Sequence, residues 1–219
     1  MAPLIDLHSH TFHSDGVLVP SELARRAESL GYDTLAMTDH VDASNVEQVV
    51  TGLLRAVEVI NRHTELTALA GCELTHVPPP AIAELVAHAR KLGAQVVLVH
   101  GETIVEPVPP GTNRAAIEAG VDILAHPGLI TEEEAGLAAA RGVSLEITAR
   151  KGHSLTNGHV VVVGRAHGCR FSVGSDAHEP GDLLTPEHID RVLRGAGLHE
   201  DEIGAVWANT RRIAEGAKD

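Results

Sequence analysis

The sequence has few aromatic residues and few cysteines. Phe, Trp and Tyr make up only 2% of the 219 residues, and Cys72 and Cys169 are the two cysteines. Two cysteines are too few for the disulfide framework of a small secreted protein, so we expect the protein in a reducing compartment, the cytoplasm. Asp6, His8 and His10 interrupt the N-terminal apolar stretch too early for a secretory signal.

Long hydrophobic runs are also missing. No apolar run approaches the roughly 18 residues that a membrane-spanning helix needs, so we expect no membrane partner. The hydrophobic fraction of 43% nevertheless excludes a disordered chain. A chain of this length forms one large domain or two small ones, and no linker or low-complexity segment divides it. We therefore predict a single domain over residues 1–219.

Positive charge is scarce as well. The chain has 17 Lys and Arg residues against 30 Asp and Glu residues, which gives a formal net charge of −13. Broad contact with a nucleic-acid backbone requires a basic surface, so nucleic acid is an unfavoured partner. Histidine, in contrast, is abundant, with 15 residues. Because histidine is the commonest protein ligand of transition metals, the composition first raises the question of a metal site.

Seven short apolar runs, several rich in β-branched residues, alternate with segments of helical pattern. Continuous apolar runs of this length are typical of parallel strands buried on both faces. The alternation predicts an α/β protein with a parallel sheet, either an open doubly wound sheet or a closed barrel. The predicted strands are residues 3–8, 33–39, 67–74, 95–101, 121–127, 143–148 and 170–176.

Helix signals lie between these strands. Pro20 fits the first turn of a helix. Ser44 with Glu47, and Thr131 with Glu134, have the spacing of capping boxes, in which the two side chains bond each other's backbone amides.

Each predicted strand carries potential metal ligands at or near its carboxyl end. In a barrel the carboxyl ends of all the strands surround one mouth, whereas an open sheet places its ligands at one switch point. Seven ligand-bearing strands therefore favour the barrel. In strand order the residues are His8 and His10, Asp39 and His40, Glu73, His100, His126, Glu146, and Asp176 and His178.

The spacings support one convergent site. His8 and His10 are two residues apart and share a face of an extended strand, as do Asp176 and His178, whereas Cys72 should point away from its neighbour. With Asp15 in the following loop, the candidate ligands number nine, counted without Asp39 and Glu146. A single ion takes about four protein ligands, so two or three ions that share a bridging carboxylate are expected. Histidine with carboxylate suits zinc, manganese or iron.

Three acidic residues are assigned supporting roles. Asp39 precedes His40 and should face the other way on a regular strand, so we expect it to orient a ligand. Glu146 has no neighbouring ligand, which favours a contact with a ligand or with substrate over direct coordination. Glu102, just beyond His100, is placed in the same supporting group.

The loop after the sixth strand contains cations beside the predicted mouth. Arg150, Lys151 and His153 are conspicuous in an acidic protein, and Asn157 precedes a glycine at a possible helix start, so this loop is a candidate clamp for a substrate phosphate. The alternative is a solvated basic turn. His13, in the first loop, is a further candidate for substrate contact, as is His76; plain exposure is the alternative for both. The remaining histidines fall on predicted helices and are expected on the surface.

The successive motifs together resemble a known family, the PHP (polymerase and histidinol phosphatase) domain. They match its motifs in order and cover most of the chain. The motifs are DLHSHTFHSDG at 6–16, TDH at 38–40, GCEL at 71–74, VHGE at 99–102, LAHPG at 124–128 and GSDAH at 174–178. The resemblance implies a distorted (β/α)7 barrel with three divalent ions at the carboxyl ends of the strands.

The resemblance also implies a ligand set. His8, His10, Glu73 and Asp176 would hold the first ion; Glu73 with His100 and His126 the second; and Asp15, His40 and His178 the third. The implied enzyme is a phosphomonoesterase of the histidinol-phosphatase type. It would hydrolyse a small phosphorylated metabolite and release inorganic phosphate.

The implied nucleophile is a hydroxide that bridges the first two ions. The residues around it are Glu73, His8, His10, His100, His126 and Asp176. Three alternatives stay open: an amidohydrolase-type metallohydrolase, a PHP-type nuclease or phosphodiesterase, and a barrel that binds metal without catalysis. The sequence leaves the phosphoester open.

Overall fold

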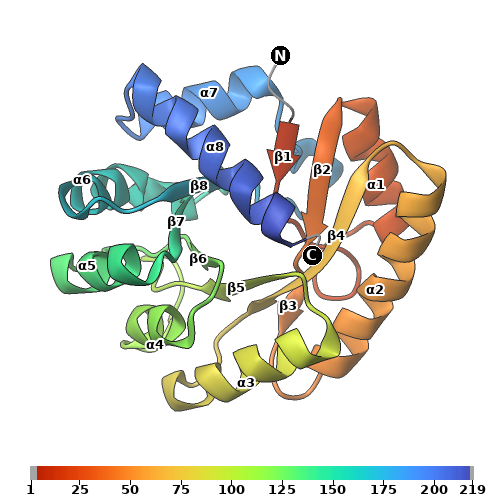
Figure 1. Ribbon diagram of the computed structural model, residues 1–219, viewed down its shortest axis with the longest axis horizontal. Helices are drawn as coiled ribbons and strands as arrows, with labels where there is room; N and C mark the ends of the chain where they lie inside the picture. Colours follow the sequence, from red (N-terminus) through yellow and green to blue (C-terminus); the bar gives the residue numbers. More distant parts are fainter. Residues whose placement is uncertain (1–3, 218–219) are drawn as a thin grey trace.

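The computed structural model describes residues 4–217 and contains a nearly closed barrel of parallel strands with helices around it (Figure 1). The (β/α)7 barrel predicted from the sequence is therefore confirmed. A two-residue strand, β3, was not predicted, and β1 is shorter than expected. The strands are β1 (Leu4–Asp6), β2 (Tyr32–Met37), β3 (His40–Val41), β4 (Thr67–Leu74), β5 (Val96–His100), β6 (Ile123–Ala125), β7 (Ser144–Thr148) and β8 (Phe171–Gly174).

The strands are hydrogen-bonded in the order β1-β2-β4-β5-β6-β7-β8, and β3 pairs with the end of β4. The seam between β8 and β1 closes beyond the strands themselves, where Ser9 forms a parallel bridge with Ala177. There the His10 N–H donates to the Ala177 carbonyl over 2.8 Å, and the Asp176 N–H donates to the His8 carbonyl over 2.9 Å. The closure of the barrel thus joins its first and last polar motifs directly.

Helices lie between successive strands on the outside of the barrel (Figure 1). Thr131 and Glu134 form the capping box that their spacing predicted. Ser44 does not cap its helix: it bonds Asp42, and Asn45 is the residue before the first turn. The helices are α1 (Pro20–Ser29), α2 (Val46–His63), α3 (Pro79–Leu92), α4 (Thr112–Ala119), α5 (Glu132–Arg141), α6 (Asn157–His167), α7 (Pro186–Gly195) and α8 (Glu200–Gly216), with short 3-10 turns η1 (His153–Thr156) and η2 (Pro180–Asp182).

The apolar core has two parts because strand side chains alternate between the two faces of the sheet. Leu69 and Leu98 belong to the smaller part, inside the barrel, which Ile213 of α8 joins. Cys72 belongs to the larger part, between the strands and the helices, and so faces away from Glu73 as predicted. Helix α8 therefore covers the amino-terminal end of the barrel, and the polar strand ends occupy the opposite, open end.

The absence of long apolar runs predicts no membrane partner. Among residues 4–217, no helix is both long enough and apolar enough to cross a membrane.

Candidate metal centre

The seam of the barrel brings the first and last histidine motifs together. The Nε2 atom of His10 lies 3.1 Å from Oδ1 of Asp176, and Nε2 of His8 lies 3.7 Å from the same oxygen. All three side chains are almost completely buried. The backbone segments that follow β1 and β8 pair with each other. This pairing fixes the arrangement, because it holds the segments that contain these three residues side by side.

Glu73 lies at the centre of the site. Its Oε2 atom is 3.3 Å from Nε2 of His8, 3.6 Å from Nε2 of His10 and 2.8 Å from Nδ1 of His40. Its Oε1 atom is 3.4 Å from Nε2 of His126. The β3–β4 pairing sets His40 directly opposite Glu73. One fully buried carboxylate is thus surrounded by four imidazoles that come from three parts of the barrel.

The electrostatics of the cluster keep its carboxylates ionised. Burial acts to raise the pKa of Glu73, but the imidazoles of His8 and His40 lower it well below its usual value. Burial likewise acts to raise the pKa of Asp176, and His8 and His10 bring it far below the usual range. Both groups therefore present negative oxygens to the mouth.

A second group of ligands lies beside Glu73, toward solvent. Oδ1 of Asp15 is 3.2 Å from Nε2 of His178 and 3.6 Å from Nε2 of His40, and His10 completes the group. Asp15 is the exposed member, and its pKa is lowered by His178 and His40 although burial acts to raise it. The structure thus places Asp15, predicted from the HSDG motif, beside the two histidines with which the resemblance grouped it.

A third group surrounds His100. Donor atoms of His100, His126 and His153 lie within 4.8 Å of one another. The rings of His126 and His153 are stacked with centroids 4.2 Å apart. Burial lowers the pKa of His100 to about 4, so this imidazole is neutral and keeps a lone pair available for a metal ion.

The buried polar atoms of this centre have few hydrogen-bond partners. Within residues 4–217, nine buried side-chain nitrogen or oxygen atoms have no hydrogen-bond partner, and seven of them belong to this cluster. They are His8 Nε2, both ring nitrogens of His10, both carboxylate oxygens of Glu73, His126 Nδ1 and Asp176 Oδ1. Buried polar atoms are normally paired, so atoms left open in a converging set of imidazoles and carboxylates fit divalent ions.

Two of the predicted supporting residues contact the site in different ways. Glu146 lies within β7 rather than at its end. Its carboxylate is 2.7 Å from Nδ1 of His8 and accepts the backbone N–H of His126 over 3.1 Å. Within residues 4–217, Asp39 forms no hydrogen bond with an imidazole. It accepts the backbone N–H and hydroxyl groups of Thr11 and Ser14, and so anchors the loop that carries Asp15.

Glu102 lies outside the metal cluster. Its Oε1 atom accepts the backbone N–H groups of Gly111 and Asn113 over 2.9 and 3.0 Å. These amides belong to the start of α4, where a carboxylate is favoured by the unpaired N–H groups. The structure therefore shows Glu102 capping a helix, a role that its place after His100 did not predict.

The predicted substrate contacts in the loop after β7 differ in exposure and in their protein partners. Lys151 is exposed, whereas the Arg150 guanidinium lies 3.2 Å from a carboxylate oxygen of Asp182. His153 is buried, and its Nδ1 atom is 2.8 Å from the hydroxyl of Thr103.

Two other predicted substrate contacts, Asn157 and His13, also contact the protein itself. The Asn157 side chain accepts the Thr148 N–H and donates to the Thr148 carbonyl, so its amide joins β7 to α6. His13 packs against Gly52 of α2, where an added Cβ would lie 2.8 Å from its ring. Neither position was visible from sequence spacing, because both depend on how loops pack against helices.

Glu106 is a site residue that sequence reasoning missed. Its carboxylate lies 3.2 Å from Nε2 of His100 and 3.5 Å from Nε2 of His153. It follows no strand directly and lies in the proline-containing loop between β5 and α4. The one available signal was an acidic residue in a loop at the ligand-bearing end of the barrel.

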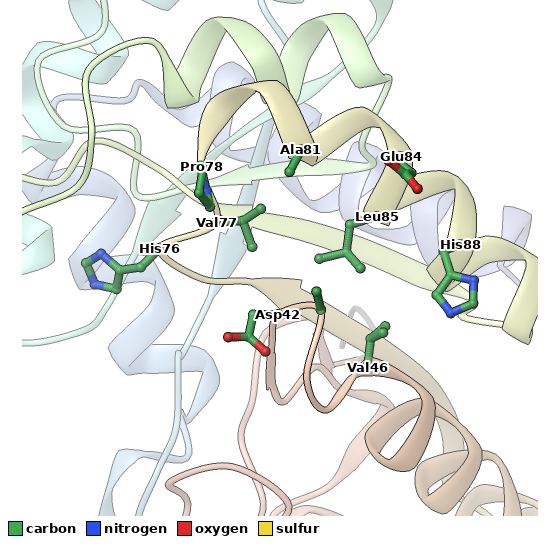
Figure 2. Close-up of a pocket in the computed structure, with 10 residues that line it drawn as sticks. Asp42, Val46, His76, Val77, Pro78, Ala81, Glu84, Leu85 and His88 are labelled. Atoms are coloured by element: carbon green, nitrogen blue, oxygen red, sulfur yellow. The ribbon is translucent and has the colours of Figure 1, made fainter.

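A groove of about 440 Å³ begins beside the metal cluster and runs between α2 and α3. Figure 2 shows His76 and Asp42 at one end, Glu84 and His88 at the other, and apolar side chains such as Leu85 between them. His76 connects the groove with the cluster, because its ring centroid is 5.3 Å from that of His100.

Comparison with known proteins supports this description. A family model described as the PHP domain matches residues 6–175. The protein MJ1295 of Methanocaldococcus jannaschii is 42% identical over 200 residues, which cover 90% of this chain and 92% of MJ1295. The 5'-3' exoribonuclease Rnm of Escherichia coli is 54% identical over 39 residues, only 18% of this chain and 13% of Rnm.

A solved structure shares the fold. Histidinol phosphate phosphatase of Lactococcus lactis, crystallised with zinc, L-histidinol and phosphate, has a TM-score of 0.62 at 14% sequence identity. The match covers 90% of this chain and 94% of that protein. At this level of identity the likeness establishes the fold alone.

Proposed function

The chain belongs to the PHP domain family and is a metal-dependent hydrolase of the phosphoesterase class, and we propose that it is a phosphomonoesterase acting on a small phosphorylated metabolite. The observation that carries the proposal is the arrangement around Glu73. An ionised, fully buried carboxylate lies within 3.6 Å of imidazole nitrogens of His8, His10, His40 and His126. Neither of its oxygens has a hydrogen-bond partner among residues 4–217.

We propose three divalent ions, drawn from zinc, manganese and iron, for this centre. The proposed ligands are His8, His10, Glu73 and Asp176 for the first ion, Glu73, His100 and His126 for the second, and Asp15, His40 and His178 for the third. Such ions supply a nucleophile at neutral pH by lowering the pKa of water from 15.7 to about 7, and they neutralise charge on phosphoryl oxygens. The extent of the unit, residues 1–219, and a cytoplasmic location stay predictions.

The chain's own side chains would bind and orient the phosphoryl group. The contact between His153 Nδ1 and Thr103 Oγ1 fixes the imidazole beside His126. With the Thr103 hydroxyl as donor, Nε2 of His153 carries the ring proton and can donate to a phosphoryl oxygen. Lys151 adds an exposed cation nearby, whereas Arg150 is already paired with Asp182.

The groove offers space for the organic part of the substrate. Its walls are apolar, and the carboxylates of Asp42 and Glu84 lie on its lining. A second phosphate or a nucleic-acid backbone would be repelled by these carboxylates and by a net charge of −13. An uncharged or cationic leaving group fits the groove better, which favours a phosphomonoesterase over a nuclease.

A substrate panel tests this proposal. The protein, loaded with Mn²⁺ or Zn²⁺ and checked by elemental analysis, is assayed with phosphomonoesters, a bis-phosphate, a phosphodiester, single-stranded DNA and RNA, and a dipeptide amide. We expect turnover of phosphomonoesters. Glu73→Gln should lose at least 100-fold in kcat/KM, while Glu215→Gln on the exposed face of α8 should retain full activity.

The other outcomes identify the alternatives. Cleavage of the diester or of nucleic acid alone would favour a nuclease, and cleavage of the amide alone would favour an amidohydrolase. Full metal content without turnover of any compound would favour a binding protein. Each of these results, or near-normal activity of Glu73→Gln, would contradict the proposal.

A further inference from the structure

Glu106 and His100 are in contact through two atoms that both carry lone pairs. The Nδ1 atom of His100 lies 3.1 Å from the Gly101 carbonyl, so Nδ1 carries the ring proton and donates it there. The imidazole is neutral, because burial lowers its pKa to about 4. Its free lone pair is therefore on Nε2, which lies 3.2 Å from Oε2 of Glu106. Two such atoms repel each other, and a cation bound to both removes the repulsion.

The spacing of these two atoms is close to that of ligands that share one ion. Ligand atoms held at about 2.0–2.1 Å by a tetrahedral zinc ion lie roughly 3.3–3.4 Å from one another. Oε1 of Glu73 and Nε2 of His126, two ligands proposed for the second ion, are 3.4 Å apart. His126 and His100 have donor atoms within 4.8 Å of each other. An ion bound to Nε2 of His100 therefore has Oε2 of Glu106 within reach.

His76 holds the Glu106 carboxylate in this position. Its Nε2 atom donates to the same oxygen, Oε2, over 3.1 Å. Within residues 4–217, three residues other than glycine have a positive φ, and they are His76, His126 and Asp176. Left-handed backbone persists where the surrounding structure enforces it, commonly at functional sites, and the other two residues are proposed metal ligands. A carboxylate oxygen has two lone pairs, so Oε2 can accept from His76 and bind an ion as well.

We propose that Glu106 is a fourth protein ligand of the second ion and that His76 is its positioning residue. The other three ligands of this ion are Glu73, His100 and His126. The proposal rests on the ions of the proposed function but not on phosphate chemistry. It adds no ion to the three, because the single free lone pair of His100 serves the second ion.

Exposure distinguishes Glu106 from the other ligands of this ion. Its side chain is 38% exposed, whereas those of Glu73, His100 and His126 are at most 3% exposed. Four protein ligands fill a tetrahedral zinc site, whereas catalytic zinc sites keep one position for water or substrate. Glu106 is therefore the ligand that an incoming anion displaces from the second ion.

Competition with a chelator tests the ligand role. The full-length protein, loaded with Zn²⁺, is equilibrated with a chelator of known affinity, and the ions retained per chain are counted by elemental analysis. Glu106→Gln should bind one ion at least about tenfold less tightly, while the other ions keep their affinity within about twofold. His76→Asn should weaken the same ion by a smaller factor, and asparagine tolerates the positive φ of residue 76.

A variant of His100 identifies the ion that is affected. His100→Asn removes a proposed ligand of the second ion, so it should weaken the same ion as Glu106→Gln does. The double variant should leave the other ions as tightly bound as in the wild type. Circular dichroism verifies that each variant is folded.

Two matched controls should keep every ion. His88→Asn changes a histidine that lines the same groove as His76, is 38% exposed and lies 3.4 Å from the carboxylate of Glu47. Glu215→Gln removes a carboxylate from the exposed side of α8. Both variants should retain their ions against the chelator as the wild type does.

Inorganic phosphate tests the displacement. At equal ion content, verified by elemental analysis, phosphate should bind Glu106→Gln at least about threefold more tightly than it binds the wild type. The reason is that no carboxylate has to leave the ion, and one negative charge near the anion is gone. Calorimetry measures both Kd values.

Three results would overturn the proposal. Retention of every ion by Glu106→Gln with wild-type affinity would show that Glu106 is no ligand. Weakening of an ion that His100→Asn leaves unaffected would assign Glu106 to a different ion. Phosphate binding that is no tighter in Glu106→Gln would contradict the displacement. None of these measurements depends on turnover, so this proposal and the phosphomonoesterase proposal can fail separately.

Discussion

The carboxylate of Glu146 lies 2.7 Å from Nδ1 of His8 inside the barrel, and both side chains are buried. Its other oxygen accepts the backbone N–H of His126 over 3.1 Å. A carboxylate on Nδ1 holds the ring proton there and leaves Nε2 as the atom with a lone pair. That Nε2 atom faces Glu73 and Asp176, so Glu146 orients His8 toward the proposed first ion.

Replacing Glu146 by glutamine should therefore weaken metal binding. The loss of the negative charge behind His8 lowers the basicity of its Nε2 atom, and changes of this kind typically cost 10- to 100-fold in metal affinity. Competition with a chelator of known affinity measures the effect. Glu215→Gln, on the exposed side of α8, controls for the loss of a carboxylate. Equal affinity in the two variants would contradict the role assigned to Glu146.

Gly174 provides a steric test of the same contact. A Cβ atom at residue 174 would lie 2.2 Å from Oε1 of Glu146 and 2.9 Å from Cβ of His8. Gly174→Ala should therefore displace both side chains, cost about 1–3 kcal/mol of unfolding free energy and lower the metal content. In contrast, a Cβ at Gly204 on α8 meets nothing within 4 Å, so Gly204→Ala should stabilise the protein by about 0.4–1 kcal/mol. Urea denaturation compares the two, and equal stability of both variants would count against the tight packing at Gly174.

Removal of metal should destabilise the fold. Seven buried polar atoms of the cluster lack hydrogen-bond partners, and a bound ion that contacts only the folded state adds about 2.7 kcal/mol at a free concentration 100 times its Kd. We expect chelation to lower the Tm, and re-addition of Zn²⁺ or Mn²⁺, but not of Na⁺, to restore it. Scanning calorimetry before and after chelation measures this. An unchanged Tm in protein shown to be metal-free would contradict the fit of the cluster to metal ions.

The two cysteines should differ in reactivity. Burial raises the pKa of the Cys72 thiol to about 12, and this side chain lies fully inside the core between β4 and the helices. Cys169 is partly exposed, although burial also raises its pKa. Because the thiolate is the reactive form, a disulfide reagent at pH 8 should modify at most one thiol of the native protein, at Cys169, and both after unfolding. Rapid modification of two thiols in the native state would show that Cys72 is not buried as described.

Sequence reasoning succeeded where strand order and alternation decide the outcome. The apolar runs predicted seven barrel strands in the correct order, and alternation along β4 placed Cys72 outward and Glu73 inward. The predicted strand bounds were too long where the backbone leaves the regular pattern, although the polar residues there reach the mouth as expected. His126 and Asp176 turn toward the mouth through a positive φ, which no two-residue period encodes, and His8 lies beyond the short β1.

Loop packing accounts for the other differences between prediction and structure. Glu106 reaches His100 because the segment between β5 and α4 folds over the mouth, and nothing in the local spacing of that segment indicates this. The Asn157 amide bonds the Thr148 backbone groups at the end of β7, a contact that the sequence did not predict, and its contact with substrate stays a prediction. In both cases a segment that folds back onto the end of the preceding strand decides what a polar side chain contacts.

Asp39 should control the loop that carries Asp15. Its Oδ1 atom accepts the N–H groups of Thr11 and Ser14 and the Ser14 hydroxyl, and its Oδ2 atom accepts the Thr11 hydroxyl, all over 2.8–3.0 Å. Asp39→Ala leaves these four donors without an acceptor, and hydrogen bonds to a charged group are worth about 1.5–3 kcal/mol each. We expect faster amide hydrogen exchange over residues 11–17 and loss of the ion proposed for Asp15, His40 and His178.

Asp39→Asn separates geometry from charge. The asparagine oxygen can accept the same three donors as Oδ1, and its amide can donate to the Thr11 hydroxyl if that hydroxyl rotates. This variant should therefore keep the loop protected from exchange and bind the ion more tightly than Asp39→Ala does. If the alanine variant showed wild-type exchange and ion content, the loop would be held by its other contacts, such as the bond from the Val17 N–H to the His178 carbonyl. The anchoring role of Asp39 would then be wrong.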